Sequence, residues 1–332
     1  MHVWVATLAG AAANTWWPAP PFDDNGAFGG IDPAAMARDP IRNVEVPGGR
    51  LRQIPGMAAS VFSGQFREDR FMMWNFFSDM RSEPPRALLY NGVFLEIGAF
   101  DGAACTPANK TAGQPFVPGI SNTYVFEKEL GWHGLLIEGG GANFVKLSKN
   151  RLRHARSGAL AHIFANASGN SIGVAGNDGR NLLIESAVAR TEGIVFFSEG
   201  NAVGGLVDGS DAEGTAYRKS WGAGRQKLHQ VRAMPMRKLL STFAPSLRHI
   251  DMISLDIEGS ELGFLETFPW SSRSGGGVSV GVIVVEITVH QTEIAALVPR
   301  VTDGEIQIYH RKGVNLYFAN VSYLTALHGG GI

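Results

Sequence analysis

The sequence predicts an α/β protein built on a mostly parallel, doubly wound sheet, and three observations lead to that fold class. From about residue 65 onward, short apolar segments alternate with segments of helical periodicity, as in successive β-α units. Residues 280–285 are rich in β-branched side chains, which is typical of a central strand covered on both faces. Residues 306–309 and 316–319 flank a turn at Lys312-Gly313, which predicts a terminal antiparallel hairpin.

The individual elements follow from local periodicity. Charged and apolar residues at helical spacing predict a helix over residues 66–77, and we expect its aromatic side chains in the core rather than in a cofactor site. Short apolar runs predict further strands at residues 93–97, 134–137, 182–184, 194–197 and 250–255. Helical periodicity predicts further helices at residues 142–153, 236–243 and 260–267. The strand at 182–184 has the weakest pattern, and we interpret that at 194–197 as a side strand.

Composition excludes several classes of protein. Of the 332 residues, 45% are hydrophobic and 18% charged, which is incompatible with a globally disordered chain. Lys and Arg number 29 against 30 Asp and Glu, so the net charge of −1 does not favour nucleic acid as a partner. A single cysteine, Cys105, excludes an intramolecular disulfide and a cysteine-rich zinc site. No apolar run reaches the length of an ordinary transmembrane helix.

The chain divides into three parts of different composition. Residues 1–58 form an irregular arm rich in Ala, Pro and Gly, residues 59–325 form the α/β domain, and residues 326–332 form a flexible tail. The first 13 residues are apolar and resemble the core of a signal peptide, but the first cationic side chain is Arg38. We therefore expect a cytoplasmic protein, with a cleaved leader as the alternative.

The loop after the first strand combines carboxylates with a glycine turn. Glu96 and Asp101 flank Gly98 and Gly102, and two glycines allow a tight turn and close approach of a ligand. The spacing is Gly-x-x-x-Gly rather than the dinucleotide pattern, and the acids would repel a diphosphate. A ligand with a cationic amino or sulfonium group would be attracted. The alternative is a structural turn with a solvated acid.

An acid also follows the second strand. Glu138 stands where an acidic side chain grips a ribose diol in nucleotide-binding α/β folds. Its separation from Gly98, 40 residues, exceeds the usual interval of about 20, and an inserted loop between the two explains the excess. The alternative is that Glu138 interacts only with the dipole of the next helix.

Acids cluster again after the strand at residues 250–255. Asp256, Glu258 and Glu261 lie within six residues of one another at the start of a helix, and such crowding is costly unless a cation neutralises it. Asp256 is a candidate for contact with cofactor or substrate, and Glu258 and Glu261 could instead cap the helix together with Ser260. Magnesium would suit such oxygen ligands, but we assign no metal.

Two titratable residues follow the strand at residues 280–285. Glu286 comes directly after it, and His290 follows four residues later. Imidazole accepts a proton near neutral pH, so His290 is a candidate general base, with a purely structural histidine as the alternative.

Four segments, in order, resemble the FkbM methyltransferase family. They are residues 93–102 (VFLEIGAFDG), 121–127 (SNTYVFE), 130–138 (LGWHGLLIE) and 254–261 (SLDIEGSE). Residues 65–71 and 202–206 are also similar, so the resemblance spans about residues 60–320. Each motif alone is weak, whereas their ordered combination is specific.

The resemblance implies a Rossmann-like, seven-stranded sheet in a three-layer α/β/α arrangement and S-adenosylmethionine as cofactor. It implies that Glu96, Gly98, Asp101 and Gly102 surround the methionine part of that cofactor. Glu138 would bind the ribose hydroxyls, and Asp256 would stand near the transferred methyl. Members mostly methylate hydroxyl oxygens of sugars, glycolipids or natural products, so a small molecule or glycan is the implied acceptor.

The chain departs from the family pattern at three places. Residues 103–120 and 157–180 look inserted, which leaves the adenine-side contacts open. Gly139-Gly140-Gly141 follows the ribose acid, where relatives tend to have Pro or Asn.

The expected mechanism is an in-line attack by a hydroxyl, with Asp256, Glu258 or His290 accepting its proton. A non-catalytic adapter on the same fold is the main alternative, although the presence of the cofactor acids argues against it. An NAD-dependent oxidoreductase is disfavoured by the acidic glycine turn. A nucleic-acid methyltransferase is disfavoured because Cys105 does not follow the fourth strand and no Asn/Asp-Pro-Pro-Tyr/Phe loop is present.

Overall fold

The structure is a computed structural model of the whole chain. It describes residues 62, 64–103, 120–151, 162–165, 172–175, 181–199, 204–207, 227–271, 277–287 and 289–329, and for 162–165 and 172–175 it describes the backbone alone. The predicted arm at residues 1–58 and Cys105 lie outside this part of the chain. The predicted domain boundaries therefore stay predictions.

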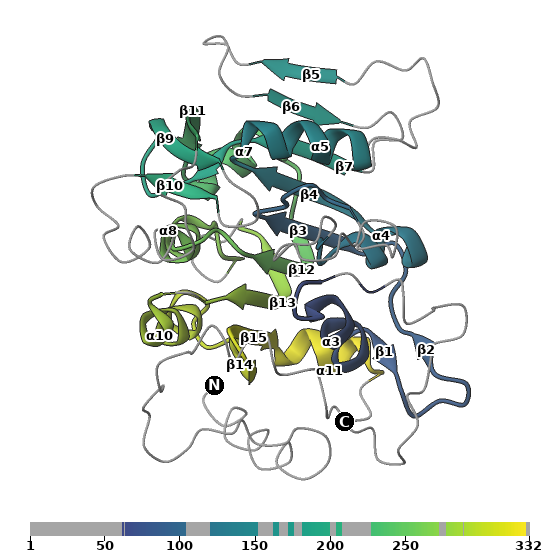
Figure 1. The fold of residues 1–332 in the computed structure, drawn as a ribbon. Coiled ribbons are helices and arrows are strands. Elements are labelled where there is room, and N and C mark those ends of the chain that lie inside the picture. The colour runs from purple at the N-terminus through teal and green to yellow at the C-terminus, as the bar shows by residue number, and fades with distance from the viewer. Residues whose placement is uncertain are drawn as a thin grey trace.

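A nine-stranded mixed sheet forms the centre of the molecule (Figure 1). Its order is β14 (Ile306–Lys312), β15 (Asn315–Asn320), β13 (Ser279–Glu286), β12 (His249–Leu255), β3 (Val93–Ile97), β4 (His133–Glu138), β7 (Asn181–Glu185), β6 (Ile172–Ala175) and β5 (His162–Ala165). Strands β13, β12, β3, β4 and β7 are parallel neighbours, and β14 and β15 form the expected antiparallel hairpin.

The predicted α/β class is confirmed, but the predicted count of seven strands in the sheet is wrong. Two short antiparallel strands, β5 and β6, extend the sheet beyond β7. They come from residues 157–180, which we interpreted as an insertion. Each has only four residues, too few for a clear alternating pattern, and they owe their placement to the exposed edge of β7.

Helices cover both faces of the sheet, and each face has its own hydrophobic core. One core contains residues of α7 (Met236–Phe243), α8 (Glu261–Thr267) and α10 (Gln291–Val301). The other contains residues of α3 (Glu68–Asn75), α4 (Tyr124–Leu130), α5 (Gly141–Arg151) and α11 (Val321–Leu327). In β3, Leu95 and Ile97 face the first core and Phe94 the second, as the two-residue period of a strand requires.

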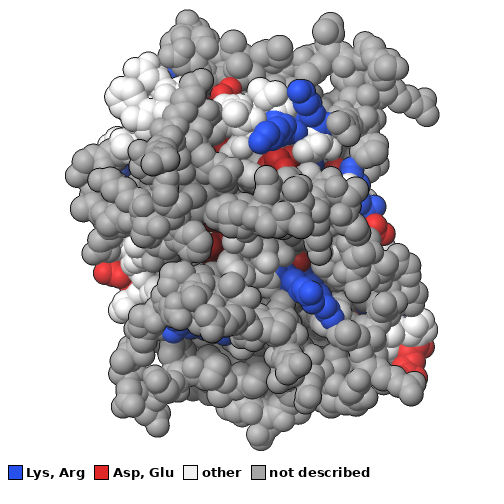
Figure 2. Space-filling model, in the orientation of Figure 1, with Lys and Arg blue, Asp and Glu red and all other residues white. Residues whose placement is uncertain are grey.

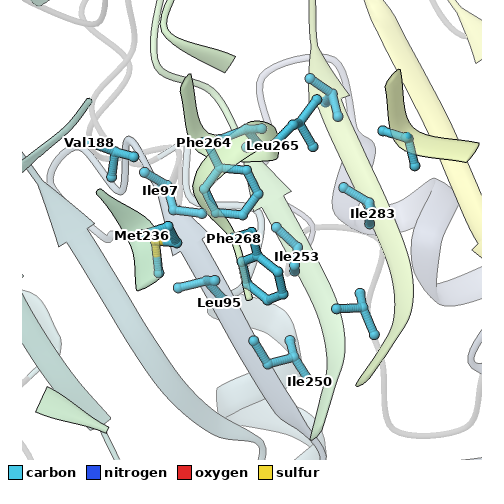
Figure 3. Close-up of a cluster of buried hydrophobic side chains, with 14 of the residues drawn as sticks. Leu95, Ile97, Val188, Met236, Ile250, Ile253, Phe264, Leu265, Phe268 and Ile283 are labelled. Atoms are coloured by element: carbon cyan, nitrogen blue, oxygen red, sulfur yellow. The ribbon is translucent and has the colours of Figure 1, made fainter. Parts of the chain in front are cut away.

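The first core shows how a strand and a helix fit together at the middle of the sheet. Phe268, which follows α8, lies between Leu95 of β3 and Ile253 of β12, and its ring packs against that of Phe264 in α8 (Figure 3). All four side chains are almost completely buried. The contacts hold the start of α8, and with it the acidic turn before α8, against the ends of β3 and β12.

A second, smaller sheet stands beside the ends of the central strands (Figure 1). It has the order β10 (Gly205–Val207), β9 (Gly193–Glu199), β11 (Lys227–Met234) and β8 (Ala187–Val188). The predicted side strand at residues 194–197 is β9, whereas the other three strands of this sheet were not predicted. A two-stranded ribbon, β1 (Ser78–Asp79) and β2 (Arg86–Ala87), completes the described strands. Among the described helices, none combines the length and apolar character needed to cross a membrane.

Candidate functional site

A cavity of about 860 Å³, part of it open to solvent, lies at the carboxyl ends of β3, β4, β12 and β13. Six acidic residues line it, and none of the described lining residues is Lys, Arg or His. The six are Glu68, Glu96, Glu138, Asp256, Glu258 and Glu286. On the face drawn in Figure 2, the visible basic side chains lie in small separate groups.

Gly98 joins two of the strand ends that form the cavity. Its φ of 78° lies in the left-handed region, and its amide donates a hydrogen bond to the carbonyl of Ile137 at 3.0 Å. A Cβ at Gly98 would stand 1.6 Å from the carbonyl oxygen of Asp256. The glycine is therefore required by the close approach of the backbone after β12, a reason that the sequence did not reveal, and it also lines the cavity.

The other residues of this loop have different positions. Asp101 is buried, and its Oδ1 accepts a hydrogen bond from the amide of Ala103 at 3.0 Å. A Cβ at Gly102 would meet the side chains of Leu147 and Arg151 on α5. Neither Asp101 nor Gly102 belongs to the cavity lining, whereas Ala99 and Phe100 do. The loop thus contacts the cavity mainly through its backbone and Gly98.

Glu96 lines the cavity but is also bound by the protein itself. Its carboxylate accepts hydrogen bonds from the hydroxyls of Ser121 and Thr123 and from the amide of Asn122, at 2.6–3.1 Å. Arg151 Nη2 forms an ion pair with it at 3.2 Å. These contacts occupy most of the acceptor positions of a carboxylate, so Glu96 fixes the beginning of α4 against β3.

Glu138 is held at the end of β4 with its carboxylate at the cavity. Its Oε2 accepts a hydrogen bond from the amide of Phe100 at 2.8 Å, and its Oε1 from the amide of Gly140 at 2.7 Å. Burial raises the pKa of Glu138 to about 7, although these hydrogen bonds act in the opposite direction. The side chain of Asn143 is a third donor to the carboxylate, which leaves about one of its roughly four acceptor positions for a ligand hydroxyl.

A second group of acids meets at the ends of β12 and β13. Asp256 and Glu286 share a side-chain hydrogen bond, and Glu68 reaches the same cavity from α3. Burial, followed by the charge of Glu261, raises the pKa of Asp256 to about 7. Burial and the charge of Asp256 raise the pKa of Glu286 well above its usual value. Such a pair can hold a proton near neutral pH.

Glu258 and Glu261 have distinct environments. Glu258 lines the cavity from a left-handed position with φ of 52°. Glu261 instead accepts hydrogen bonds from the amides of Ile257 and Gly259, at 3.3 and 3.0 Å, which closes the turn before α8. Ser260 is the N-cap residue of α8 but makes no side-chain capping bond. The described part of the chain contains no group of three or more acidic, His or Cys residues arranged to hold a metal ion.

His290 lies apart from these residues. It is the N-cap residue of α10, with φ of 58°, and it does not line the cavity. Glu286 does line it, and so does Glu68, although neither was among the predicted site residues. Glu286 could have been found in the sequence because it comes directly after the apolar run at residues 280–285. Glu68 could not, because its α3 precedes the first strand of the central sheet in sequence and gave no signal of a site.

The raised pKa of Glu138 predicts a pH-dependent stability. Glu138 binds a proton more tightly in the folded protein than in the unfolded chain. Its contribution to the free energy of unfolding is therefore complete below the unfolded pKa of 4.5 and is lost as the pH rises through about 7. At about 1.4 kcal/mol for each tenfold change in proton affinity, the loss is about 3 kcal/mol. In denaturant unfolding, we expect Glu138→Gln to remove most of this loss between about pH 5 and about pH 8. The matched Glu293→Gln variant, at an exposed position, should keep it. An unchanged pH profile in Glu138→Gln would contradict the raised pKa.

Comparison with known families identifies the domain. The family model described as the methyltransferase FkbM domain matches residues 97–309, which is more than half of the chain. The match runs from the end of β3 to β14 and includes most of the cavity lining, whereas Gln65, Glu68 and Glu96 lie outside it. No curated protein and no solved structure matches the chain. The chain belongs to the FkbM methyltransferase family.

Proposed function

We propose that the protein is an S-adenosylmethionine-dependent methyltransferase that acts on a hydroxyl oxygen of a sugar, glycolipid or natural product. The observation that carries this proposal is the position of Glu138 at the cavity, oriented by two backbone amides next to the Gly98 turn. The many acids and the lack of a basic residue in the described lining favour a cationic ligand over a phosphorylated one.

The residues of the cavity fit that cofactor. Glu138 would accept hydrogen bonds from the ribose hydroxyls. Phe197 of β9 offers an aromatic wall beside Gly139, where a Cβ would lie 2.5 Å from the ring. When bound, the cofactor supplies a methyl group activated by a positively charged sulfur. Asp256, Glu258 or Glu286 would accept the proton of the attacking hydroxyl.

The alternative is a methyltransferase fold that binds a partner without catalysis. The two functions differ in whether the cavity binds the cofactor, because an adapter would not need a carboxylate at Glu138 oriented for a ribose. Calorimetric titration of the full chain with S-adenosylmethionine separates them. Binding supports the enzyme, and absence of binding favours the adapter.

We expect Glu138→Gln to weaken cofactor binding about 10-fold to 100-fold. A hydrogen bond to a charged group contributes about 1.5–3 kcal/mol, and the amide side chain keeps only one acceptor oxygen. The measurement is the dissociation constant of S-adenosylmethionine by calorimetry at about pH 8, where Glu138 is ionised.

The control is Glu266→Gln, which changes an exposed acid of α8 that pairs with Arg190. Its affinity should equal that of the unmodified protein. Equal affinity in Glu138→Gln would remove Glu138 from the ribose site and leave the proposed cofactor without its main anchor.

A further inference from the structure

The carboxyls of Asp256 and Glu286 are brought together by the register of the central sheet. In the parallel pair β12 and β13, Leu255 lies opposite Val285. The next residues along the two strands are Asp256 and Glu286, so both side chains emerge at the same edge and face of the sheet. They share a hydrogen bond, and both residues keep some exposed surface because they line the cavity. A ligand in the cavity can therefore reach the pair.

The surroundings of the pair are predominantly negative. Five carboxyl groups and one tyrosine hydroxyl interact with the pair or with one of its members. They come from α3, β3, β4, β15, the turn before α8 and the first residue of α8. These are Glu68, Glu96, Glu138, Tyr317, Glu258 and Glu261. Arg151 is committed to Glu96 and Glu127, and Lys312 acts on Glu68. The lining of the described cavity thus offers the pair no basic residue of its own.

We propose that Asp256 and Glu286 form a cation subsite that holds one shared proton and releases it when a positively charged group enters the cavity. This inference rests on the proposed function, because the cation would be the sulfonium of the methyl donor. It gives Glu286 a role together with Asp256, because the pair becomes ionised, and able to accept a proton, only when the positive charge is bound. Two adjacent carboxyls avoid mutual repulsion by sharing a proton. A nearby cation stabilises both carboxylates and so lowers the proton affinity of the pair.

The proton balance gives the pair a defined task in methyl transfer. On entry of the cation, an O–H bond of the pair breaks, and the proton passes to solvent. The ionised pair then accepts the proton of the acceptor hydroxyl as the C–O bond forms and the C–S bond to the methyl carbon breaks. The pair ends protonated beside an uncharged thioether, which is the state it prefers. A hydroxyl bound without the cation would meet a protonated, inactive pair.

The test compares proton release on binding of S-adenosylmethionine and of S-adenosylhomocysteine. The two ligands share the ribose, so any proton released by Glu138 is common to both and cancels. Titration calorimetry at about pH 7, in two buffers of different ionisation enthalpy, gives the number of protons released by each. We expect binding of S-adenosylmethionine, which carries the additional sulfonium charge, to release up to about one proton more than binding of S-adenosylhomocysteine. We also expect Glu286→Gln to abolish this difference, whereas the matched Glu266→Gln variant keeps it.

Each outcome decides the matter. Equal proton release by the two ligands in the unmodified protein overturns the cation subsite while leaving the proposed function intact. A difference that survives in Glu286→Gln assigns the proton to another group and also overturns it. Failure of both ligands to bind defeats the proposed function itself, and the inference with it. If Glu286→Gln does not fold, equal release by the two ligands on the unmodified protein still overturns the subsite, and Asp256→Asn replaces Glu286→Gln as the variant that assigns the proton.

Discussion

Replacing Arg151 by Met should lower the free energy of unfolding by about 3–5 kcal/mol. The Arg151 side chain is completely buried and forms ion pairs with Glu96 and Glu127. Its Nη2 also donates hydrogen bonds to the hydroxyls of Ser121 and Thr123, at 2.7 and 2.5 Å. Although burial raises the pKa of Glu127, Arg151 and Lys128 hold it below its ordinary value. Without Arg151, the buried carboxylate of Glu96 would lose its cation, and the half-buried Glu127 would keep only Lys128.

The matched control is Arg190→Met, which breaks the exposed ion pair with Glu266. Exposed pairs contribute about 0–1 kcal/mol, so this variant should unfold at nearly the same denaturant concentration as the unmodified protein. Chemical denaturation of both variants at about pH 7 measures the difference. A loss below about 1 kcal/mol for Arg151→Met would show that the network around Glu96 is not needed for stability.

Replacing Asp256 by Asn should reduce the turnover of methyl transfer by about 10²-fold to 10⁴-fold, the usual contribution of a positioned general base. Asp256 lines the cavity and shares a hydrogen bond with Glu286. The substitution keeps the shape of the side chain but removes its ability to take up a proton. The measurement is transfer of a labelled methyl group from S-adenosylmethionine into an extract of the native organism, followed by identification of the labelled product.

Two further variants make this result specific. His290→Ala tests the histidine that the sequence suggested as a base, and we expect little effect because His290 does not line the cavity. Glu293→Gln, an exposed acid on the same helix, controls for general changes in α10. Full activity in Asp256→Asn, or a large loss in His290→Ala, would reverse the assignment of the base.

Several elements could be predicted because their signals are local. The run of β-branched residues became β13, and the Lys312-Gly313 turn joins β14 to β15. The helix predicted at residues 236–243 has those bounds in the structure. Other elements gave no such signal: α4 and α11 have only seven residues each, and α10 contains Pro299, which obscures a helical pattern. Tertiary packing decides such short or interrupted segments.

The cavity brings together only some of the predicted site residues, and the others lie outside its lining for one reason. Glu96, Gly98, Glu138, Asp256 and Glu258 all line the cavity, because acids and glycines that follow parallel strands meet at one edge of the sheet. Asp101, Gly102 and His290 follow the same strands in sequence but do not line it. The sequence gives the distance of a residue from the end of a strand, whereas the turn that follows decides the direction of its side chain.

By itself, the sequence determined the family, the alternation of strands and helices, and the clustering of acids after the strands. These properties depend on the order and spacing of residues along the chain. Only the tertiary structure decided that Glu68 joins the cavity from α3, that Glu96 is paired with Arg151, and that Asp256 lies beside Glu286. Those relations depend on strand register and helix packing between segments up to about 220 residues apart. Such contacts leave no local pattern, because the sequence around each partner is compatible with its own helix or strand and does not indicate the distant residue.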